Sequence, residues 1–514
     1  MVTQTNGKTI AKNTVYLYFN MMVTIVISLY TSRVILKVLG IDDYGIYQTV
    51  GGVVGLLSFL NSALGVGSSR FLTYELGKGD IVKLNKTFST ILTAHIILAI
   101  GIVVVAETIG LWFVYHKVVI PPDRMHAAVI SYHLSVLAAV LHLLQVPYTA
   151  SIISHEKMSI YAYVSIVDAV LKLFIVYMLL MSSADKLIMY SILICIVIFL
   201  MLMCYYLYCV HFFPESTCKL IIDKPILKDV LGYSGWNLFA NSALALNNYG
   251  SVLLLNIFFN PGVVTARAVA NQVNMAAYHF ITNFRTAATP QIVKQYAIED
   301  FEGSKSLLLA STKYSYYMML LLALPIFLVA PQLLEIWLGQ IPPYADIFLQ
   351  LTIVCSLFQV FDSSFYTALY AKGQIKENAL ISPTILFISF PIVYLLFRNG
   401  FSPEVYAWVS LVCYAILALL VKPILIIKIV NYTWGEILNV FFICLKVTVL
   451  SSLFPAIIYL KKDAYPMNGY LWFGILVFIS LFCVVFAVWA VGLTPSERGT
   501  LTNYVKRRLH QTSE

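Results

Sequence analysis

One stretch of the chain carries two arginines together with amide and hydroxyl side chains at helical spacing. At 100° per residue, all of them fall within an arc of about 80° on one helix face: Arg267, Asn271, Asn274, Tyr278, Thr282 and Arg285. The two arginines are eighteen residues apart, which corresponds to about 27 Å of helical rise. Because guanidinium groups bind phosphates through bidentate, charge-assisted hydrogen bonds, this stripe predicts an anionic cargo.

The composition places this stripe in a membrane. Hydrophobic residues make up 60% of the chain and charged residues 11%, whereas soluble domains are typically about 45–50% apolar. We therefore expect an all-α polytopic membrane protein. No P-loop is present and every connection is short, so we predict no catalytic residues and no enzyme activity. The eight cysteines have no C-x-x-C spacing, and neither a metal site nor a cofactor is indicated.

The apolar runs predict about fourteen transmembrane helices, since a spanning helix needs about 20 apolar residues. The predicted spans are 12–38, 44–68, 88–115, 125–150, 158–182, 187–211, 230–257, 263–289, 307–330, 344–371, 378–397, 403–421, 437–460 and 468–493. Lys and Arg are concentrated in alternate connections, which predicts that both termini are cytoplasmic. The net charge of +9 follows from this topology, so a nucleic-acid partner is not expected.

Three short strings recur in the same order in the two halves of the chain. Ile-Pro-Pro at 120 and 341, Tyr-Thr-Ala at 148 and 366, and Ile-Val-Tyr at 175 and 392 have offsets of 221, 218 and 217 residues. Six spans separate the copies, so the halves are parallel repeats. We predict an N-lobe with helices 1–6, a C-lobe with helices 7–12, two appended helices 13–14 and a basic cytoplasmic tail, covering residues 1–222, 223–433, 434–493 and 494–514.

Polar faces also occur on the first and seventh spans. They consist of Asn13, Tyr16 and Asn20, and of Asn237 and Asn241. One interpretation is a shared hydrated cavity whose amide and tyrosine side chains contact sugar hydroxyls; the alternative is that these residues join helices through interhelical hydrogen bonds. For Arg267 and Arg285, an anion site competes with extension of each side chain from a helix end to the membrane interface.

Three charged residues in the spans are candidates for ion coupling or gating. Asp168 and Lys172 are four residues apart in the fifth span, so they share a face and can neutralise each other. A purely structural pair is the alternative. Asp362 in the tenth span, beside two serines, is a further candidate ion site.

Several motifs near the N-terminus have a family resemblance, which is specific over about residues 10 to 90. They are Lys12-Asn13-Thr14, Leu29-Tyr30-Thr31-Ser32-Arg33, Leu39-Gly40, Asp43-Tyr44-Gly45-Ile46-Tyr47, Val50-Gly51-Gly52-Val53-Val54, Arg70-Phe71-Leu72 and Glu75-Leu76-Gly77-Lys78-Gly79. These motifs resemble those of bacterial polysaccharide-biosynthesis and O-antigen oligosaccharide flippases, within the multidrug/oligosaccharidyl-lipid/polysaccharide exporter superfamily. The first span departs from this pattern, because its sole arginine, Arg33, is near its outer end.

The resemblance implies a flippase that moves undecaprenyl-pyrophosphate-linked oligosaccharide, as in lipopolysaccharide synthesis, from the inner to the outer leaflet of the bacterial cytoplasmic membrane. It implies alternating access about a cationic cavity, with lipid-linked oligosaccharide and membrane lipids as partners. A monomer is expected, with a polysaccharide polymerase or export machinery as candidate protein partners. The alternatives are a cation-coupled drug or metabolite exporter of the same superfamily and a membrane scaffold without transport activity.

Overall fold

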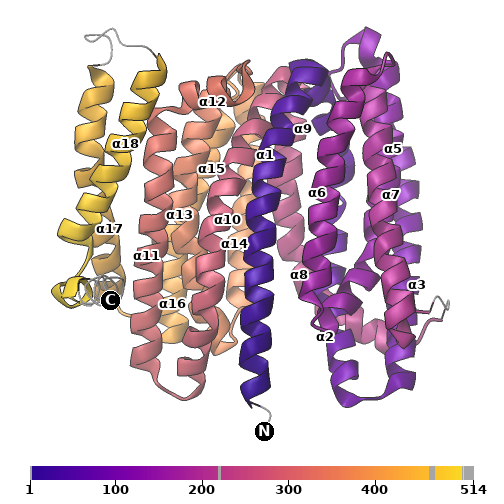
Figure 1. Ribbon diagram of the computed structural model, residues 1–514, viewed down its shortest axis with the longest axis horizontal. Coiled ribbons are helices and arrows are strands. Elements are labelled where there is room, and N and C mark those ends of the chain that lie inside the picture. The colour runs from indigo at the N-terminus through magenta and orange to yellow at the C-terminus, as the bar shows by residue number, and fades with distance from the viewer. Residues whose placement is uncertain (1–2, 218–220, 462–468, 500–501, 503–514) are drawn as a thin grey trace, which may run out of the picture. The chain divides into compact units, whose positions relative to one another are not determined.

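The computed structural model describes residues 3–217, 221–461, 469–499 and 502. Within these ranges, the side chains of residues 3–20, 62, 63, 66, 231–237, 240, 283, 286 and 287 are outside the description. Every regular element in the described ranges is a helix, and Figure 1 shows long helices lying side by side. The prediction of an all-α polytopic membrane protein is confirmed.

Contacts between Cα atoms divide the chain into two compact units. The first consists of Met1–Val269, Pro342–Ala345 and Ala379–Tyr406, and the second of Ala270–Ile341, Asp346–Asn378 and Ala407–Glu514. This division differs from the predicted boundary between residues 222 and 223, because the seventh span is in the first unit. The predicted lobes were defined by the sequence repeat, whereas the two units are defined by contacts. The lobe boundaries stay a prediction.

The helices begin and end close to the predicted spans. The long ones are α1 Thr3–Gly55, α2 Ser58–Lys78, α3 Ile81–Val105, α5 Met125–Ser154, α6 Met158–Met181, α7 Lys186–Phe212, α8 Lys224–Ala245, α10 Pro261–Ala297, α11 Phe301–Leu328, α13 Ala345–Lys372, α14 Lys376–Arg398, α15 Val405–Ile416, α17 Trp434–Leu460 and α18 Gly469–Ala487. Shorter ones are α4 Leu111–His116, α9 Ser251–Phe258, α12 Ala330–Leu338 and α16 Lys422–Val430. Five-residue π-turns connect α3 to α4, α8 to α9 and α15 to α16; such turns keep a helix continuous while shifting its face.

Eleven of the described helices are long and apolar enough to cross a membrane. Helices α2, α8 with α9, and α10 are not among them, because polar residues interrupt their apolar runs. Two of the polar faces noted in the sequence, those of the seventh and eighth spans, lie on α8 and α10.

The break between the first two predicted spans is present, and only the second span requires a correction. Gly40 has a non-helical backbone with φ of 82° and ψ of 173°, a positive φ that favours glycine, so α1 consists of two helical stretches that meet there. The predicted span 44–68 is divided near Leu57, where α1 has ended at Gly55 and α2 begins at Ser58. Periodicity cannot detect this second break, because apolar residues continue through it.

In the first unit, the start of α10 packs against the kink of α1. Asn260 caps α10, its Oδ1 accepting from the Val263 amide at 3.0 Å, and proline follows at the first helical position. Thr265 donates to the Ile41 carbonyl at 2.7 Å. A Cβ built on Gly45 would lie 2.0 Å from the Pro261 carbonyl oxygen, so the two backbones are in direct contact there. These contacts fix the end of α10 that carries Arg267.

In the second unit, α11 packs against the appended helices α17 and α18. The hydroxyl of Tyr317 on α11 donates to the Gly492 carbonyl at 3.0 Å. Lys313 Nζ, also on α11, lies 2.8 Å from Glu497 Oε1, and the Tyr314 hydroxyl donates to the same carboxylate at 2.7 Å. The chain following α18 is therefore held against the helix bundle.

Candidate functional site

Arg285 points from α10 toward α13 within the second unit. Its Nη2 donates to the Ser363 carbonyl and lies 3.3 Å from the Thr367 hydroxyl. A small hollow beside it is lined by further hydroxyl-bearing residues, among them Thr289, Ser311 and Ser364. The guanidinium thus lies among polar groups between helices, and its role in binding an anion stays a prediction.

Lys422, the first residue of α16, is a buried cation that the sequence reasoning missed. Only 2% of its surface is exposed, and its Nζ lies 3.2 Å from Asp362 Oδ1 of α13. It also donates to Asn378 Oδ1 of α14 and lies 5.4 Å from the Tyr366 ring centre. The predicted span ended at 421, and the apolar residues 424–427 were the signal that the helix continues beyond the lysine.

Asp362 is therefore part of an ion pair on α13. Helices α10, α13, α14 and α16 bring two cations and one carboxylate together in the second unit. A net positive, partly buried cluster of this kind favours an anion over a cation, because like charge raises the free energy of a bound cation. The assignment of Asp362 to ion coupling or gating stays a prediction.

The middle of the α10 stripe contacts α13. Ser356 Oγ donates to Asn274 Oδ1 at 2.5 Å, and Asn274 is 7% exposed. The Tyr278 hydroxyl donates to Ser363 Oγ at 3.0 Å. Asn271 contacts Met275 Sδ on its own helix at 3.7 Å. Asn274 and Tyr278 thus make the interhelical hydrogen bonds expected of helix packing, and their role in a cavity stays a prediction.

Arg267 lies in the first unit, against α15. Its Nη2 is 3.3 Å from the Tyr406 hydroxyl, and its Cζ is 5.1 Å from that ring's centre. The Tyr406 hydroxyl in turn donates to the Asn247 carbonyl at 3.3 Å. Among the described residues, the buried Nη1 of Arg267 has no hydrogen-bond partner. A buried guanidinium nitrogen without an acceptor is costly, and an oxyanion would satisfy it.

The remaining predicted cavity residues are described only in part. The side chains of Asn13, Tyr16, Asn20 and Asn237 lie outside the described part of the structure. Asn241 is half-buried on α8. The cavity predicted on the first and seventh spans therefore stays a prediction.

Asp168 and Lys172 form an ion pair on α6. Lys172 Nζ lies 2.8 Å from Asp168 Oδ2, and the two side chains are 37% and 29% exposed, lysine first. The pairing follows from their spacing of four residues. Each carboxylate among the three charged candidates is thus paired with a lysine, which lowers its tendency to bind a free cation.

A second charged group that the sequence reasoning missed joins three helix ends of the first unit. Arg124 Nη2 lies 2.6 Å from Asp43 Oδ2 of α1, and its Nη1 lies 2.5 Å from Asp185 Oδ2. Asp185 also caps α7 by accepting from two backbone amides. Burial raises the pKa of Asp185. The hydrogen bonds from Arg124 and from the two backbone amides have a larger, opposite effect, so the pKa of Asp185 is lowered overall. No local sequence motif predicts this cluster of one arginine and two aspartates, because its members are far apart in the sequence.

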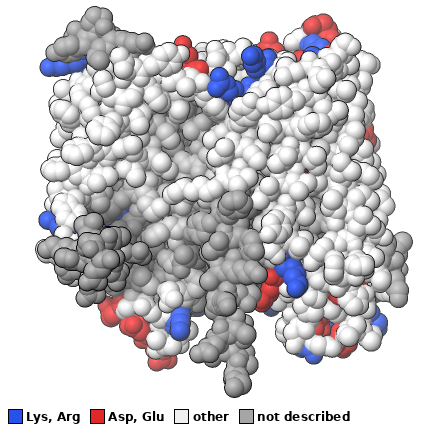
Figure 2. Space-filling model, in the orientation of Figure 1, with Lys and Arg blue, Asp and Glu red and all other residues white. Residues whose placement is uncertain are grey.

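Most charged side chains are near the ends of helices. Figure 2 shows blue and red atoms toward the helix ends and uncharged atoms along the middle of the helices on this face. That distribution is expected of helices that cross a membrane. Lys422 and Arg285 differ from this distribution, because each lies inside a continuous helical segment and not at its end.

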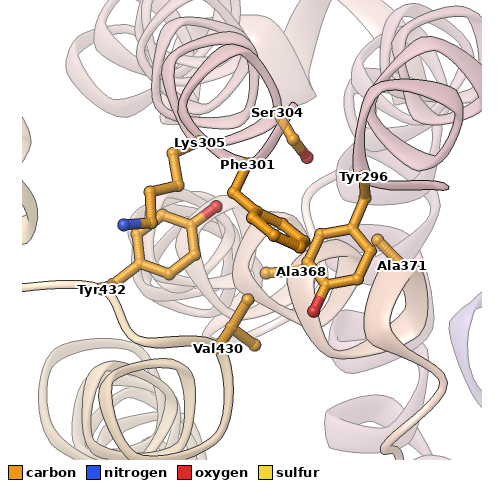
Figure 3. Close-up of a pocket in the computed structure, with 8 residues that line it drawn as sticks. All are labelled: Tyr296, Phe301, Ser304, Lys305, Ala368, Ala371, Val430 and Tyr432. Atoms are coloured by element: carbon orange, nitrogen blue, oxygen red, sulfur yellow. The ribbon is translucent and has the colours of Figure 1, made fainter. Parts of the chain in front are cut away.

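Figure 3 shows a small aromatic hollow at the ends of α10, α11, α13 and α16. Tyr296 and Phe301 meet edge to face, with ring centres 5.0 Å apart. Lys305 Nζ lies 5.6 Å from the centre of the Tyr432 ring. The hollow ties the connection after α10 to neighbouring helix ends, and so it fixes the end of α10 near Arg285.

Among the described residues, no group of three His, Cys, Asp or Glu side chains is arranged to hold a metal ion. The geometry that is present consists of paired charges, hydroxyls and one partnerless guanidinium nitrogen. Such groups can hold an anion.

No protein-family model and no curated protein matches the sequence. Solved structures do match. A lipid II flippase MurJ in an inward closed conformation aligns with a TM-score of 0.69 and 13% identity, over 93% of this chain and 98% of that one.

Two further transporter structures match as well. An inward-facing multidrug resistance MATE family transporter of the MOP superfamily aligns with a TM-score of 0.66 and 13% identity, over 80% of this chain and 99% of that one. A MOP superfamily transporter from Pyrococcus furiosus aligns with a TM-score of 0.58 and 14% identity, over 82% and 97%. The protein is therefore a multi-pass membrane protein with the fold of MOP-superfamily transporters.

Proposed function

We propose that this protein is a flippase that moves undecaprenyl-pyrophosphate-linked oligosaccharide from the inner to the outer leaflet of the bacterial cytoplasmic membrane by alternating access. Arg267 carries the proposal: among the described residues its buried Nη1 has no acceptor, and a pyrophosphate oxygen supplies one. Arg285, about 27 Å farther along the same helix, binds the anionic group of the cargo at a different stage of its passage. The amides and tyrosines of the polar faces contact the sugars.

The extent of the structural matches supports a lipid-linked cargo over a drug. The lipid II flippase aligns over 93% of this chain and the other two transporters over 80–82%. The difference is close in size to the two appended helices, residues 434–493. An added helix pair would accommodate a long isoprenoid chain, which a small drug does not have.

A cation-coupled exporter is the second candidate, and the carboxylates bear on it. Such a transporter needs a carboxylate that is free to bind Na⁺ or H⁺. Asp168 and Asp362 are each paired with a lysine, so these two acids do not favour it. We propose that the Lys422–Asp362 pair holds α16 to α13 or gates the movement of the lobes, and that the Asp168–Lys172 pair neutralises its own charges within α6 or gates the same movement. Both termini are cytoplasmic in this proposal, and the protein acts as a monomer.

The test combines gene deletion with a leaflet assay for the lipid-linked glycan. Deletion should trap the glycan in the inner leaflet, and wild-type protein should restore its appearance in the outer leaflet. Arg267→Met should abolish this rescue while changing thermal stability little, because the loss of the Tyr406 contacts is offset by removal of a buried nitrogen that has no acceptor among the described residues. Arg267→Lys should rescue poorly, since an ammonium cannot bind phosphate in bidentate fashion.

Arg398→Gln provides the matched control, because Arg398 is an exposed residue at the end of α14. It should rescue as well as wild type. Normal outer-leaflet glycan in the deletion strain would refute the proposed function. Full rescue by Arg267→Met would refute the assigned residue while leaving the function standing.

A further inference from the structure

The first unit contains a cavity of about 370 Å³, and neither arginine of the stripe is among its lining residues. Helices α1, α2, α3, α5 and α7 and the turn before α9 line it. Its volume is within the range of about 300–1,000 Å³ that is usual for small-molecule sites. No charged side chain lines it. The polar residues that do are Tyr47, Ser58, Asn61, Ser135, His142 and Tyr249.

Two glycines of α1 form one wall of this cavity. A Cβ built on Gly55 would lie 2.5 Å from Tyr249 Cδ1, so the tyrosine ring lies directly on that glycine. One turn earlier, a Cβ on Gly51 would meet nothing within 4 Å. Gly55 lets the tyrosine ring approach the helix, whereas Gly51 leaves open space that a side chain would fill.

Asn61 has a hydrogen-bonding capacity that the protein leaves unused. Within the described part of the chain, its buried Oδ1 has no partner. A polar atom in that state costs free energy, which is recovered if the amide turns toward a hydroxyl group in the cavity. Nearby on the α5 wall, Ser135 donates its own hydrogen to the Ser131 carbonyl at 2.7 Å, so its oxygen can still accept.

The lining selects the chemistry of the occupant. An ion has no counter-charge there, and burying it would cost several kcal/mol. A purely aliphatic chain would leave the amide, imidazole and hydroxyls without partners. A neutral, hydroxyl-rich ring satisfies both conditions, because hydroxyls exchange hydrogen bonds with these groups while its apolar face packs on a tyrosine ring.

We infer that this cavity is a subsite for one neutral sugar residue of the transported glycan. The inference rests on the proposed function, and it separates the tasks within the cargo: guanidinium groups hold the phosphates, and the uncharged cavity of the first unit holds a sugar. Its residues are distinct from the polar faces of the first and seventh spans.

Saturation-transfer NMR on the full-length protein in lipid nanodiscs tests the inference, with free glucose and N-acetylglucosamine as probes. Wild type should show transfer to at least one sugar. Gly51→Leu should weaken that binding by about tenfold or more, because Gly51 lines the cavity and a Cβ added there meets nothing within 4 Å, so the new side chain occupies cavity space. Gly101→Leu is the matched control, since Gly101 is an exposed helical glycine that also has nothing within 4 Å, and it should bind as wild type does.

Asn61→Leu distinguishes ligand binding from structure. It should weaken sugar binding about three- to tenfold, the contribution of one neutral hydrogen bond, while the thermal unfolding temperature stays the same or rises. Absence of transfer to either sugar in wild type would overturn the inference, as would unchanged binding in Gly51→Leu or Asn61→Leu.

The leaflet assay separates this inference from the proposed function. If wild type restores outer-leaflet glycan and Gly51→Leu does so equally well, the sugar subsite is refuted and the flippase stands. If sugars bind and Gly51→Leu abolishes binding, but deletion leaves the outer-leaflet glycan normal, the flippase is refuted and the sugar site stands.

Discussion

Replacing Lys422 by Met should destabilise the second unit through the carboxylate that it leaves behind. Lys422 is 2% exposed and lies 3.2 Å from Asp362, whose side chain is 22% exposed. Removing one partner of a fully buried ion pair costs about 3–5 kcal/mol. Because Asp362 keeps some exposure, and surface pairs contribute only about 0–1 kcal/mol, we expect a loss of about 2–3 kcal/mol.

The double variant Lys422→Met/Asp362→Asn should recover most of this loss, since no buried charge is then left unpaired. The Asp362→Asn variant should be destabilised as well, although the Lys422 ammonium keeps the Asn378 oxygen as an acceptor. The double-mutant cycle should therefore give a coupling of about 2 kcal/mol, within the range for groups in contact.

The measurement is the unfolding temperature of wild type, the two single variants and the double variant in nanodiscs at one scan rate, which ranks their stability. Lys446→Met is the control, because Lys446 is an exposed lysine within a spanning helix, and its removal should shift the temperature little. If Lys422→Met is as stable as wild type, or if the double variant is no better than the singles, the reasoning about this pair is wrong.

Three further predictions concern the contacts that hold each unit together. Gly45→Ala should lower the unfolding temperature, because its Cβ would lie 2.0 Å from the Pro261 carbonyl oxygen; an unchanged temperature would show that the two helices part easily. Arg124→Gln should cost about 1–3 kcal/mol in thermal stability by leaving two part-buried carboxylates unpaired, and a neutral result would mean that solvent replaces the guanidinium. Burial raises the pKa of Glu497, but hydrogen bonds from the lysine and tyrosine of α11 outweigh it and lower the pKa to about 2. The stability that Glu497 contributes is therefore complete above its unfolded value of about 4.3 and lost as the pH falls toward 2. The unfolding temperatures of wild type and Glu497→Gln should differ at pH 7 and converge in that window, and a difference independent of pH would contradict the linkage.

Much of the fold was predictable because long apolar runs in the sequence identify membrane-spanning helices. A backbone in lipid must satisfy its own hydrogen bonds, so long apolar runs become helices, and the predicted spans are close to the observed helices apart from the second. The division of the second span near Leu57 and the extension of α16 to Val430 were missed. Both depend on local backbone geometry and packing, to which hydropathy is insensitive.

The candidate site was predictable only in part. The polar face of α10 followed from helical periodicity, and the Asp168–Lys172 pair followed from a spacing of four residues. The contact of Lys422 with Asp362 joins residues sixty positions apart. No periodicity connects them.

The sequence by itself determined that the chain is a bundle of membrane-spanning helices with polar faces on particular ones, since apolar length and angular position around a helix are local properties. Only the tertiary structure decided what those faces meet. It places Arg285 against the carbonyl of Ser363, leaves a nitrogen of Arg267 without an acceptor among the described residues, and opens a cavity beside Gly51. The physical reason is that helix packing is set by the sum of many weak contacts between distant segments, and the partner of a polar group is fixed only when that packing is complete.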